Sequence, residues 1–283
     1  MRKRLRDSLL GVFSSEDLSR IPNSFDIVGD IAIIKLPSSL HLKAKKVANA
    51  IMHIHRNVKT VLLQATPVAG DFRLRNLAHL AGENKTRTIH REFGCLFSVD
   101  LAKCYFSPRL SHERMKIAKL VEPNETVVNM FAGVGCFSII IARHANPAQV
   151  FSVDINPAAI QFMKENIELN RVYRKVIPLL GDSKEIICDR LCNSADRVLM
   201  PLPEKSFEYL PYALSALKKS GGWIHYYSFE YAPKTENPGE RAKTRITEKL
   251  DTLGINFTIP SFRIVRSTGP NYSQIAADIH VTF

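Results

Sequence analysis

Apolar and polar positions follow two different patterns along the chain. From residue 126 onward, short apolar runs bounded by Gly, Pro, Asn or Asp alternate with longer segments of helical periodicity. This alternation predicts a doubly wound α/β domain, with parallel strands and helices on both faces of the sheet. The runs that we expect to form its strands are 126–130, 149–155, 176–180, 197–200 and 222–227.

The segments between and after these runs complete the prediction. Pro157 opens an amphipathic helix with Ile160, Met163 and Ile167 on one face, and residues 207–217 fit another helix. A polar stretch at 232–243 leads into a further helix, and two strand-like runs follow at 259–265 and 275–281. A closing antiparallel pair after five parallel strands favours a methyltransferase-type sheet over a six-stranded dinucleotide sheet.

Before residue 126 the pattern predicts a small α+β domain. Extended runs at 25–36, 60–64, 86–92 and 95–99 surround one helix at 41–55. A helix within 107–120 carries the chain into the sheet. We therefore expect two domains, at 1–106 and 107–283, which is an ordinary number for a chain of 283 residues.

Charge and cysteine content narrow the function classes. Residues 1–114 carry 19 Lys or Arg against 10 Asp or Glu, and the rest carry 20 against 17. This excess suggests an N-terminal region that faces phosphates, although a solvated basic surface explains it as well. Five cysteines without a paired spacing indicate reduced thiols and no metal site. No apolar run approaches the roughly 20 residues that a bilayer demands, so we expect a cytoplasmic protein without membrane contact.

A glycine loop after the first strand of the sheet carries the clearest chemistry. The strand leads into Phe131, and Gly133 and Gly135 let the backbone approach a ligand at a helix N-terminus. Asp154 ends the next strand, where a carboxylate can accept hydrogen bonds from both ribose hydroxyls. The pair indicates an adenosine-binding site. Ser138 replaces the third glycine of a dinucleotide fingerprint, which disfavours a nucleotide-linked oxidoreductase.

Asp182 follows the third strand of the sheet and has two interpretations. Its carboxylate could accept a hydrogen bond from an adenine amino group, or it could cap the next helix.

Several long motifs resemble the archaeal and eukaryotic tRNA (guanine-37-N1)-methyltransferase family, which includes related wybutosine-pathway transferases. They are FDIVGDIAII at 25–34, GDFRLR at 70–75, FSPRLSHER at 106–114, NMFAGVGCFS at 129–138, DRVLMPLP at 196–203 and HYY at 225–227. The resemblance covers nearly the whole chain. It implies a class I methyltransferase fold with a Rossmann-like, seven-stranded sheet, S-adenosylmethionine as cofactor, and the anticodon arm of tRNA as partner.

The resemblance also implies roles for single residues in methylation of guanine N1. This nitrogen carries a proton at neutral pH, so attack on a methyl group needs a base for that proton and a cation or donor at O6. The family's carboxylate maps onto Glu113 as base, with a surface carboxylate paired to Arg109 or Lys116 as the alternative. The family's arginine maps onto Arg73 at O6, with a phosphate contact as the alternative and Arg75 as substitute.

Two further residues belong to the expected substrate site. Tyr105 could support a flipped base by stacking, and a tyrosine of the hydrophobic core is an equal alternative. Arg109 stands in the Ser-Pro-Arg motif, whose arginine the aminocarboxypropyl-transferring relatives lack, so it favours methyl transfer. The basic residues Arg2, Lys3, Arg4, Arg6, Lys43, Lys45 and Lys46 could hold the anticodon arm, or form a solvated face.

Two departures from the family pattern bear on the substrate. Asn129 stands where the family has Asp, which removes a charge beside the cofactor loop. Pro201 stands where typical members have an Asn that contacts the target guanine. The alternative is therefore an enzyme that modifies the tricyclic wybutosine precursor at the same nucleotide, by C7 methylation or aminocarboxypropyl transfer. An inactive RNA-binding module is disfavoured by the retained loop, Asp154 and Glu113. We expect a monomer.

Overall fold

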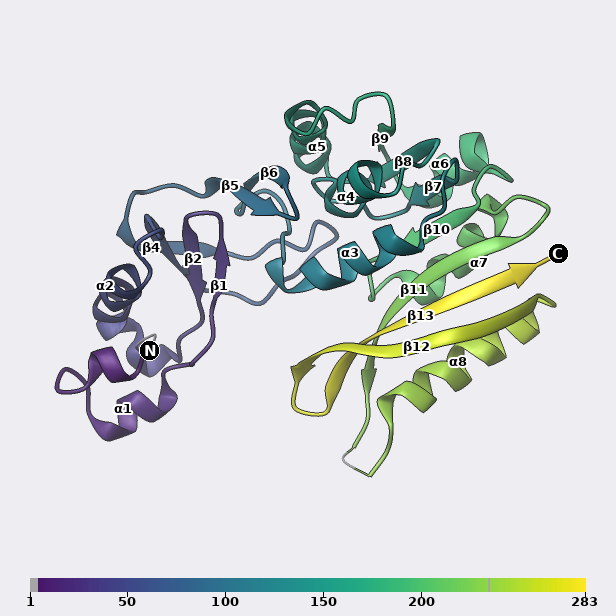
Figure 1. Ribbon diagram of the computed structural model, residues 1–283. Coiled ribbons are helices and arrows are strands. Elements are labelled where there is room, and N and C mark those ends of the chain that lie inside the picture. Colours follow the sequence, from purple (N-terminus) through teal and green to yellow (C-terminus); the bar gives the residue numbers. More distant parts are fainter. Residues whose placement is uncertain (1–4, 234) are drawn as a thin grey trace. The chain divides into compact units, whose positions relative to one another are not determined.

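The computed structural model describes residues 5–233 and 235–283, which divide into two compact units, Met1–Ser111 and His112–Phe283 (Figure 1). Each unit has its own sheet and its own hydrophobic core. The first family motifs therefore lie in one unit, and the glycine loop and Glu113 lie in the other.

The second unit contains the expected seven-stranded sheet, in the order β12-β13-β11-β10-β7-β8-β9. Its parallel strands are β7 (Thr126–Asn129), β8 (Gln149–Asp154), β9 (Val176–Leu180), β10 (Arg197–Met200) and β11 (Gly222–Tyr231). The strand β13 (Tyr272–Thr282) lies antiparallel between β11 and β12 (Asn256–Gly269). The class I methyltransferase fold is thus confirmed, and the closing strands are longer than the sequence predicts.

Helices cover both faces of this sheet (Figure 1). On one side lie α4 (Cys136–His144) and α5 (Pro157–Leu169), and on the other lie α7 (Ser206–Ala216) and α8 (Pro238–Thr252). The helix α5 begins as the sequence predicts, because Asn156 accepts a hydrogen bond from the Ala158 backbone N–H at 3.0 Å and Pro157 occupies the first turn. Three further elements complete the unit: α3 (Ser111–Leu120), α6 (Ser183–Ile186) and a π-helical turn, η4 (Ile187–Leu191).

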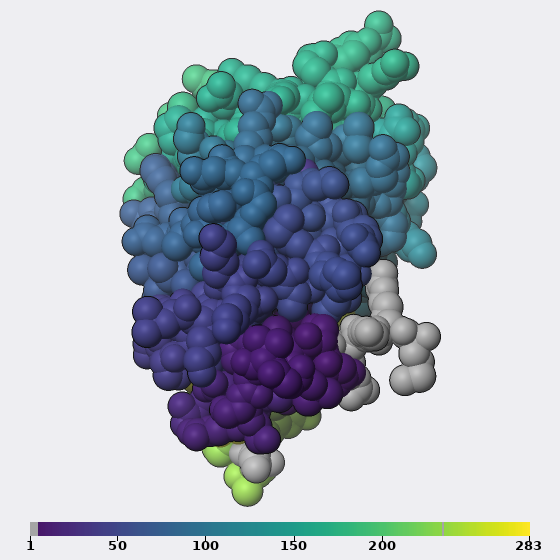
Figure 2. All heavy atoms as spheres, turned by 90° about the vertical axis from the view of Figure 1, so that its left-hand side faces the viewer, coloured from purple at the N-terminus to yellow at the C-terminus, as the bar shows by residue number. Residues whose placement is uncertain are grey.

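The N-terminal unit is built on a four-stranded sheet and a separate hairpin. Its atoms are coloured purple to blue in Figure 2. The sheet has the order β1 (Asp26–Val28), β2 (Ile31–Ile34), β3 (Thr60–Gln64) and β4 (Leu77–Gly82). The hairpin pairs β5 (Arg87–Glu92) with β6 (Cys95–Asp100). The helices are η1 (Asp7–Leu9), α1 (Ser15–Arg20), η2 (Ser38–Lys43), α2 (Ala44–Ile54) and η3 (Pro108–Leu110).

Three details of this unit differ from the sequence prediction. The sequence predicts one helix, at 41–55, and the structure adds a second one, α1, near the start of the unit. The run at 25–36 folds back on itself as β1 and β2, because Gly29 adopts φ +56° and permits a tight turn. The strand β4 was not predicted, since the segment Leu77–Gly82 has no β-branched residue and no strict alternation.

The cysteines are free, and they differ in exposure. Cys95, Cys104 and Cys136 are buried, and Cys188 and Cys192 are exposed. No described helix combines the length and apolar character that crossing a bilayer requires.

Candidate active site

The glycine loop lies between β7 and α4, at the carboxyl edge of the parallel strands. Gly135 caps α4 with φ +90°, and a Cβ there would lie 2.8 Å from Cγ of Met163. Gly133 has φ +55°, and a Cβ there would meet nothing within 4 Å. Gly135 is therefore required by packing, whereas Gly133 presents bare backbone to open space, as a ligand cradle does.

Asp154 is tied directly to this loop. Its Oδ2 accepts a hydrogen bond from the Gly133 backbone N–H at 2.6 Å, and its Oδ1 accepts one from Asn156 at 2.9 Å. Burial raises the pKa of the Asp154 carboxyl, and these two hydrogen bonds oppose the shift without cancelling it. The structure thus brings together the loop and the acid that the sequence paired as an adenosine site.

Asn129 supplies an unpaired acceptor at the end of β7. Its Nδ2 donates to Ser138 Oγ at 3.1 Å, whereas its Oδ1 is buried and has no hydrogen-bond partner among the described residues. A buried acceptor without a partner carries a free-energy cost that a ligand donor would remove. The open cradle at Gly133 and this acceptor both fit a bound adenosyl amino acid.

Apolar side chains lie beside the acid at the same sheet edge. Ile155 directly follows Asp154 and is 46% exposed, and Leu180 ends β9 and is 53% exposed. Exposed apolar groups there suit the faces of a purine ring. Neither residue was predicted from the sequence, although each is an apolar residue at or just after the end of a strand.

Asp182 caps the helix α6, as one interpretation of the sequence holds. Its Oδ1 accepts from the Lys184 backbone N–H at 3.0 Å, and its Oδ2 accepts from the Tyr209 hydroxyl at 2.9 Å. Burial and the neighbouring Asp182 raise the pKa of Tyr209, so this hydroxyl stays a donor. The ring of Tyr209 packs edge-on against Phe131 of the glycine loop, at 5.3 Å between centroids.

Pro201 begins the turn that follows β10. Ser206 holds this turn, because its hydroxyl lies 2.9 Å from both the Met200 and the Leu202 carbonyl oxygens. Pro201 itself is half-buried. Its lack of an amide side chain removes any donor or acceptor beyond its own carbonyl.

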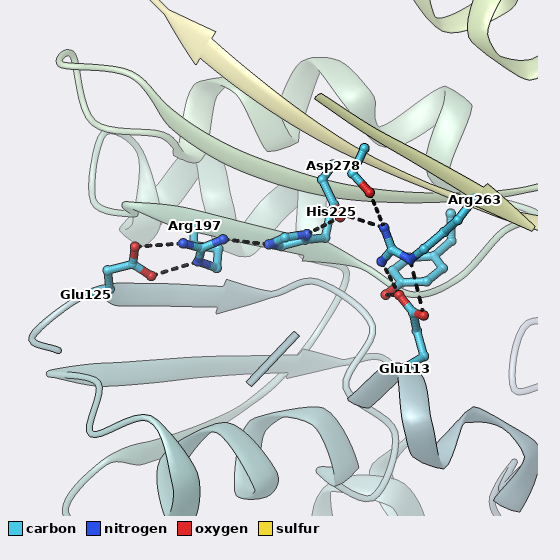
Figure 3. Close-up of polar contacts among 8 residues, drawn as sticks. Glu113, Glu125, Arg197, His225, Arg263 and Asp278 are labelled. Atoms are coloured by element: carbon cyan, nitrogen blue, oxygen red, sulfur yellow. Dashed lines mark hydrogen bonds and ion pairs between the residues drawn. The ribbon is translucent and has the colours of Figure 1, made fainter. Parts of the chain in front are cut away.

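Glu113 lies on α3 and is only 8% exposed. Its Oε1 accepts hydrogen bonds from the Tyr227 hydroxyl at 3.0 Å and from Nη2 of Arg263, and its Oε2 lies 3.4 Å from Nε of Arg263 (Figure 3). Burial and the charge of Glu113 raise the pKa of Tyr227, so its hydroxyl remains a neutral donor. The interpretation of Glu113 as a surface carboxylate paired with Arg109 or Lys116 is therefore wrong.

Four predicted substrate residues lie in the N-terminal unit. The Arg73 guanidinium lies over the Tyr105 ring at 4.1 Å from its centroid, and Arg73 adopts the rare φ of +54°. Arg75 donates to Gln64 at 3.0 Å, and burial lowers the pKa of its guanidinium. Arg109 pairs with Asp26 at 2.6 Å. The structure thus joins Arg73 to Tyr105 and gives each of the other two arginines a partner.

The basic residues proposed for the anticodon arm divide into three groups. Arg2, Lys3 and Arg4 lie outside the described residues. Arg6 donates to the backbone carbonyls of Ile21 and Ser19, and Lys43 pairs with Asp17, so these two serve the fold of their own unit. Lys45 and Lys46 are exposed on α2.

Comparison with known proteins decides the family. A family model described as the TRM5/TYW2 methyltransferase domain matches residues 88–252, and one described as the TYW2 N-terminal domain matches residues 5–86. The chain belongs to the TRM5/TYW2 family. Relatives in this family have been crystallised with adenosine and with AdoMet, and S-adenosylmethionine is the cofactor.

Individual TRM5/TYW2 relatives carry more specific names. The tRNA (guanine(37)-N(1))-methyltransferase Trm5b of Pyrococcus abyssi is 44% identical over 93% of this chain and 76% of its own. The tRNA 4-demethylwyosine(37)-methyltransferase Taw21 of Saccharolobus solfataricus is 36% identical over 93% of this chain and 96% of its own. A solved complex of aTrm5 with tRNALeu has a TM-score of 0.85 at 34% identity, covering 100% of this chain and 79% of that one.

Proposed function

We propose that this protein transfers a methyl group from S-adenosylmethionine to N1 of guanosine 37, just 3′ of the anticodon of tRNA. The observation that carries the proposal is Glu113: a buried carboxylate, fixed by Arg263 and Tyr227, at the position where the family resemblance requires a base. The identity to Trm5b of Pyrococcus abyssi supports the same reaction. We place the enzyme in the cytoplasm, acting as a monomer on the anticodon arm.

The glycine loop and its neighbours would hold the cofactor. Asp154 would receive the ribose hydroxyls, Ile155 and Leu180 would cover the adenine faces, and the free Oδ1 of Asn129 would accept from the amino acid end. When bound, S-adenosylmethionine supplies a sulfonium methyl group of high reactivity. Asp182 is held by Lys184 and Tyr209 and would reach the adenine amino group only through its remaining acceptor capacity.

The protein's own side chains handle the guanine. Glu113 would accept the N1 proton, which leaves the electron pair on N1 for attack, and the family resemblance assigns to Arg73 the charge that gathers on O6. The contact between Arg73 and Tyr105 gives this arginine a fixed surface, and Tyr105 offers its ring for stacking. Arg75 and Arg109 would bind the nucleotide through donors that their present partners leave unused.

Mass spectrometry of digested tRNA tests the reaction directly. The purified protein, incubated with S-adenosylmethionine and an unmodified transcript bearing G37, should yield 1-methylguanosine, and a transcript with A37 should yield none. Glu113→Gln should reduce turnover by about 10²- to 10⁴-fold at unchanged S-adenosylhomocysteine affinity, because only the proton acceptor is removed.

Glu122→Gln is the matched control, since Glu122 is an exposed carboxylate just beyond the same helix. It should keep the turnover of the unaltered protein. Full activity of Glu113→Gln would remove Glu113 as the base.

Pro201 favours a second candidate, a transferase acting on the tricyclic wybutosine precursor. The relative Taw21, whose name specifies 4-demethylwyosine, is similar over nearly all of its own length. If only a tRNA carrying that tricyclic base accepts the methyl group, or an aminocarboxypropyl group appears in the product, the second candidate replaces the first. Pro201→Asn should then raise activity on the G37 transcript, because it restores an amide for guanine.

A further inference from the structure

A row of buried charged groups continues behind the Glu113–Arg263 pair (Figure 3). Asp278 on β13 accepts from Nη1 of Arg263 at 2.7 Å with one oxygen, and its other oxygen lies 2.7 Å from Nδ1 of His225 on β11. Nη1 of Arg197 on β10 lies 2.7 Å from Nε2 of the same histidine. Asp278 thus shares Arg263 with Glu113 and is itself held in place.

The contacts of His225 fix the position of its proton. An arginine can only donate, so Nε2 of His225 accepts from Arg197, and the single ring proton lies on Nδ1 and is donated to Asp278. Burial and the neighbouring cations lower the pKa of His225, which keeps the ring neutral. Burial would raise the pKa of Asp278, but the hydrogen bond from His225 and the charge of Arg263 lower it on balance. Asp278 therefore stays ionised.

The two oxygens of Glu113 are not equivalent. Oε1 receives both the Tyr227 hydroxyl and Nη2 of Arg263, whereas among the described residues Oε2 has only the long 3.4 Å contact with Nε of Arg263. Oε2 consequently keeps a lone pair that can accept a proton. Protonation of Glu113 leaves Arg263 paired with Asp278, so the largely buried guanidinium never lacks a counter-ion.

We propose that Asp278, oriented by His225, competes with Glu113 for Arg263, so that Glu113 can take a proton without leaving this cation unpaired, and that Oε2 of Glu113 is the oxygen that takes the guanine proton. The proposal rests on the proposed function. In the step itself the N1–H bond breaks, an O–H bond forms at Oε2, and the electron pair stays on N1. Asp278, His225 and Arg263 are positioning residues, because they act on guanine only through Glu113.

The charged and titratable groups around Glu113 come from four elements. They are Tyr227 and His225 on β11, Arg263 on β12, Asp278 on β13, and the helix neighbours His112, Arg114 and Lys116 on α3. Tyr227 and His225 stay neutral, so the charges in this row that lie nearest to Glu113 are those of Arg263, its direct partner, and Asp278, which shares Arg263. These two charges have opposite signs, and their removal should have opposite effects.

Single-turnover rates of methyl transfer, measured against pH with saturating cofactor and tRNA, test this point. Asp278→Asn leaves Arg263 with Glu113 alone, so the acid side of the profile should move to lower pH by about one unit and the maximal rate should fall. Arg263→Gln removes the cation, so the acid side should move to higher pH by about one unit. Arg263→Lys keeps the charge and should leave the acid side close to its original position.

Glu230→Gln is the matched control, because Glu230 is also a buried carboxylate on β11 that pairs with an arginine, Arg245, at 3.3 Å. Its profile should match that of the unaltered protein. The proposal would be overturned if the pH–rate profiles of Asp278→Asn and Arg263→Gln moved in the same direction, or if neither profile moved. If Asp278→Asn does not fold, the comparison of Arg263→Gln with Arg263→Lys tests the proposal, because only the profile of Arg263→Gln should move to higher pH.

Product analysis separates this outcome from failure of the proposed function. If the unaltered protein makes 1-methylguanosine and Glu113→Gln does not, the function stands even when the profiles do not move in opposite directions. If the unaltered protein methylates a different atom, the function fails by itself.

Discussion

Gly133 and Gly135 stand two residues apart in one loop, yet the structure gives them different tasks. Both have positive φ, which L-amino acids with a side chain adopt at a cost. Only Gly135 is also crowded, by Met163 and Ile139. A single methyl group added at each position therefore separates a requirement of the fold from a requirement of ligand binding.

Gly135→Ala should lower the free energy of unfolding by about 2–4 kcal/mol, because backbone strain and overpacking both apply. Gly133→Ala should cost only about 1 kcal/mol, yet weaken S-adenosylhomocysteine binding at least about tenfold, since its methyl group enters the open cradle. Thermal unfolding and calorimetric titration measure the two quantities. Equal destabilisation by both substitutions, or undiminished binding by Gly133→Ala, would contradict this division.

At the scale of single residues, the sequence predicted what depends on local pattern. Gly133 and Asp154 were paired from the strand–loop–strand spacing, and the structure joins them by a hydrogen bond of 2.6 Å. Arg263 and Asp278 were not predicted, because nothing near them in the chain marks them as partners of Glu113. Arg263 and Asp278 come together through the register of β13 against β12, in which Ser261 pairs with Asp278. Irregularities in the pairing lie before and after this region, and a sequence pattern does not predict them.

At the scale of elements, strand pairing assembles the buried charged row. The strands β10, β11, β13 and β12 are neighbours in the sheet, and Arg197, His225, Asp278 and Arg263 lie on them in that order. Glu125, in the turn before β7, closes the row with two hydrogen bonds from Arg197 at 2.7 and 2.8 Å. Each strand thus places one charged or polar group between those of its neighbours, and removal of one takes away one of the two partners of each neighbour.

This arrangement makes the stability of the second unit depend on pH. The pKa of His225 lies below its ordinary value of 6.5 in the folded protein. Below that value the unfolded chain binds a proton that the folded protein does not, so the free energy of unfolding should fall as the pH drops, by at most about 1.4 kcal/mol per pH unit. Urea unfolding at about pH 7.5 and about pH 5.5 measures the slope.

His225→Gln should flatten this slope, because glutamine takes up no proton. The lowered pKa of Asp278 acts only below its ordinary value of 3.8, outside that window. If the free energy of unfolding changed equally with pH in both proteins, other histidines would be the cause of the pH dependence.

Sequence patterns predicted the sheet strands better than the N-terminal unit. Buried parallel strands are continuous apolar runs, which are visible in one dimension, and all five were predicted within a few residues. The segments of β1 and β4 are only partly buried, so they carry weaker apolar patterns. The turn at Gly29 that splits β1 from β2 is fixed by hydrogen bonds from the Gly29 and Asp30 backbone N–H groups to His90 and Thr88, which are distant in the sequence.

At the scale of the whole molecule, the uneven distribution of positive charge along the chain bears on how the protein binds RNA. Residues 1–114 hold nine positive charges in excess, against three in the remainder. The described part of this excess includes Lys45 and Lys46, both exposed on α2 and without an ion pair in the described structure. We therefore expect these lysines to contact tRNA phosphates.

Replacing both with glutamine should reduce the steepness of log Kd for tRNA against log salt by about 0.7–0.9 for each phosphate that is no longer neutralised. Filter binding between about 50 and 200 mM salt measures this slope. Lys164→Gln, at an exposed lysine on α5, is the control and should leave it unchanged. An unchanged slope in the double variant would make α2 a solvated face.

The proposed boundary between residues 106 and 107 has a test at the same scale. A fragment of residues 107–283 contains the whole seven-stranded sheet, the glycine loop and Glu113. It should bind S-adenosylhomocysteine within about threefold of the complete chain, because the cofactor residues all lie within it, and it should not methylate tRNA. Calorimetry that shows no binding to a folded fragment would place part of the cofactor site in the N-terminal unit.

The insertion of β13 between β11 and β12 has a consequence for the enzyme during its synthesis. A ribosome synthesises Glu113, His225 and Arg263 before Asp278. A growing chain can therefore form the parallel strands and the glycine loop while the place of β13, between β11 and β12, is still empty. Until that late strand enters, Arg263 and His225 have no shared carboxylate. A nascent chain can therefore bind its cofactor early, but the charged groups around Glu113 are complete only when translation has passed residue 278.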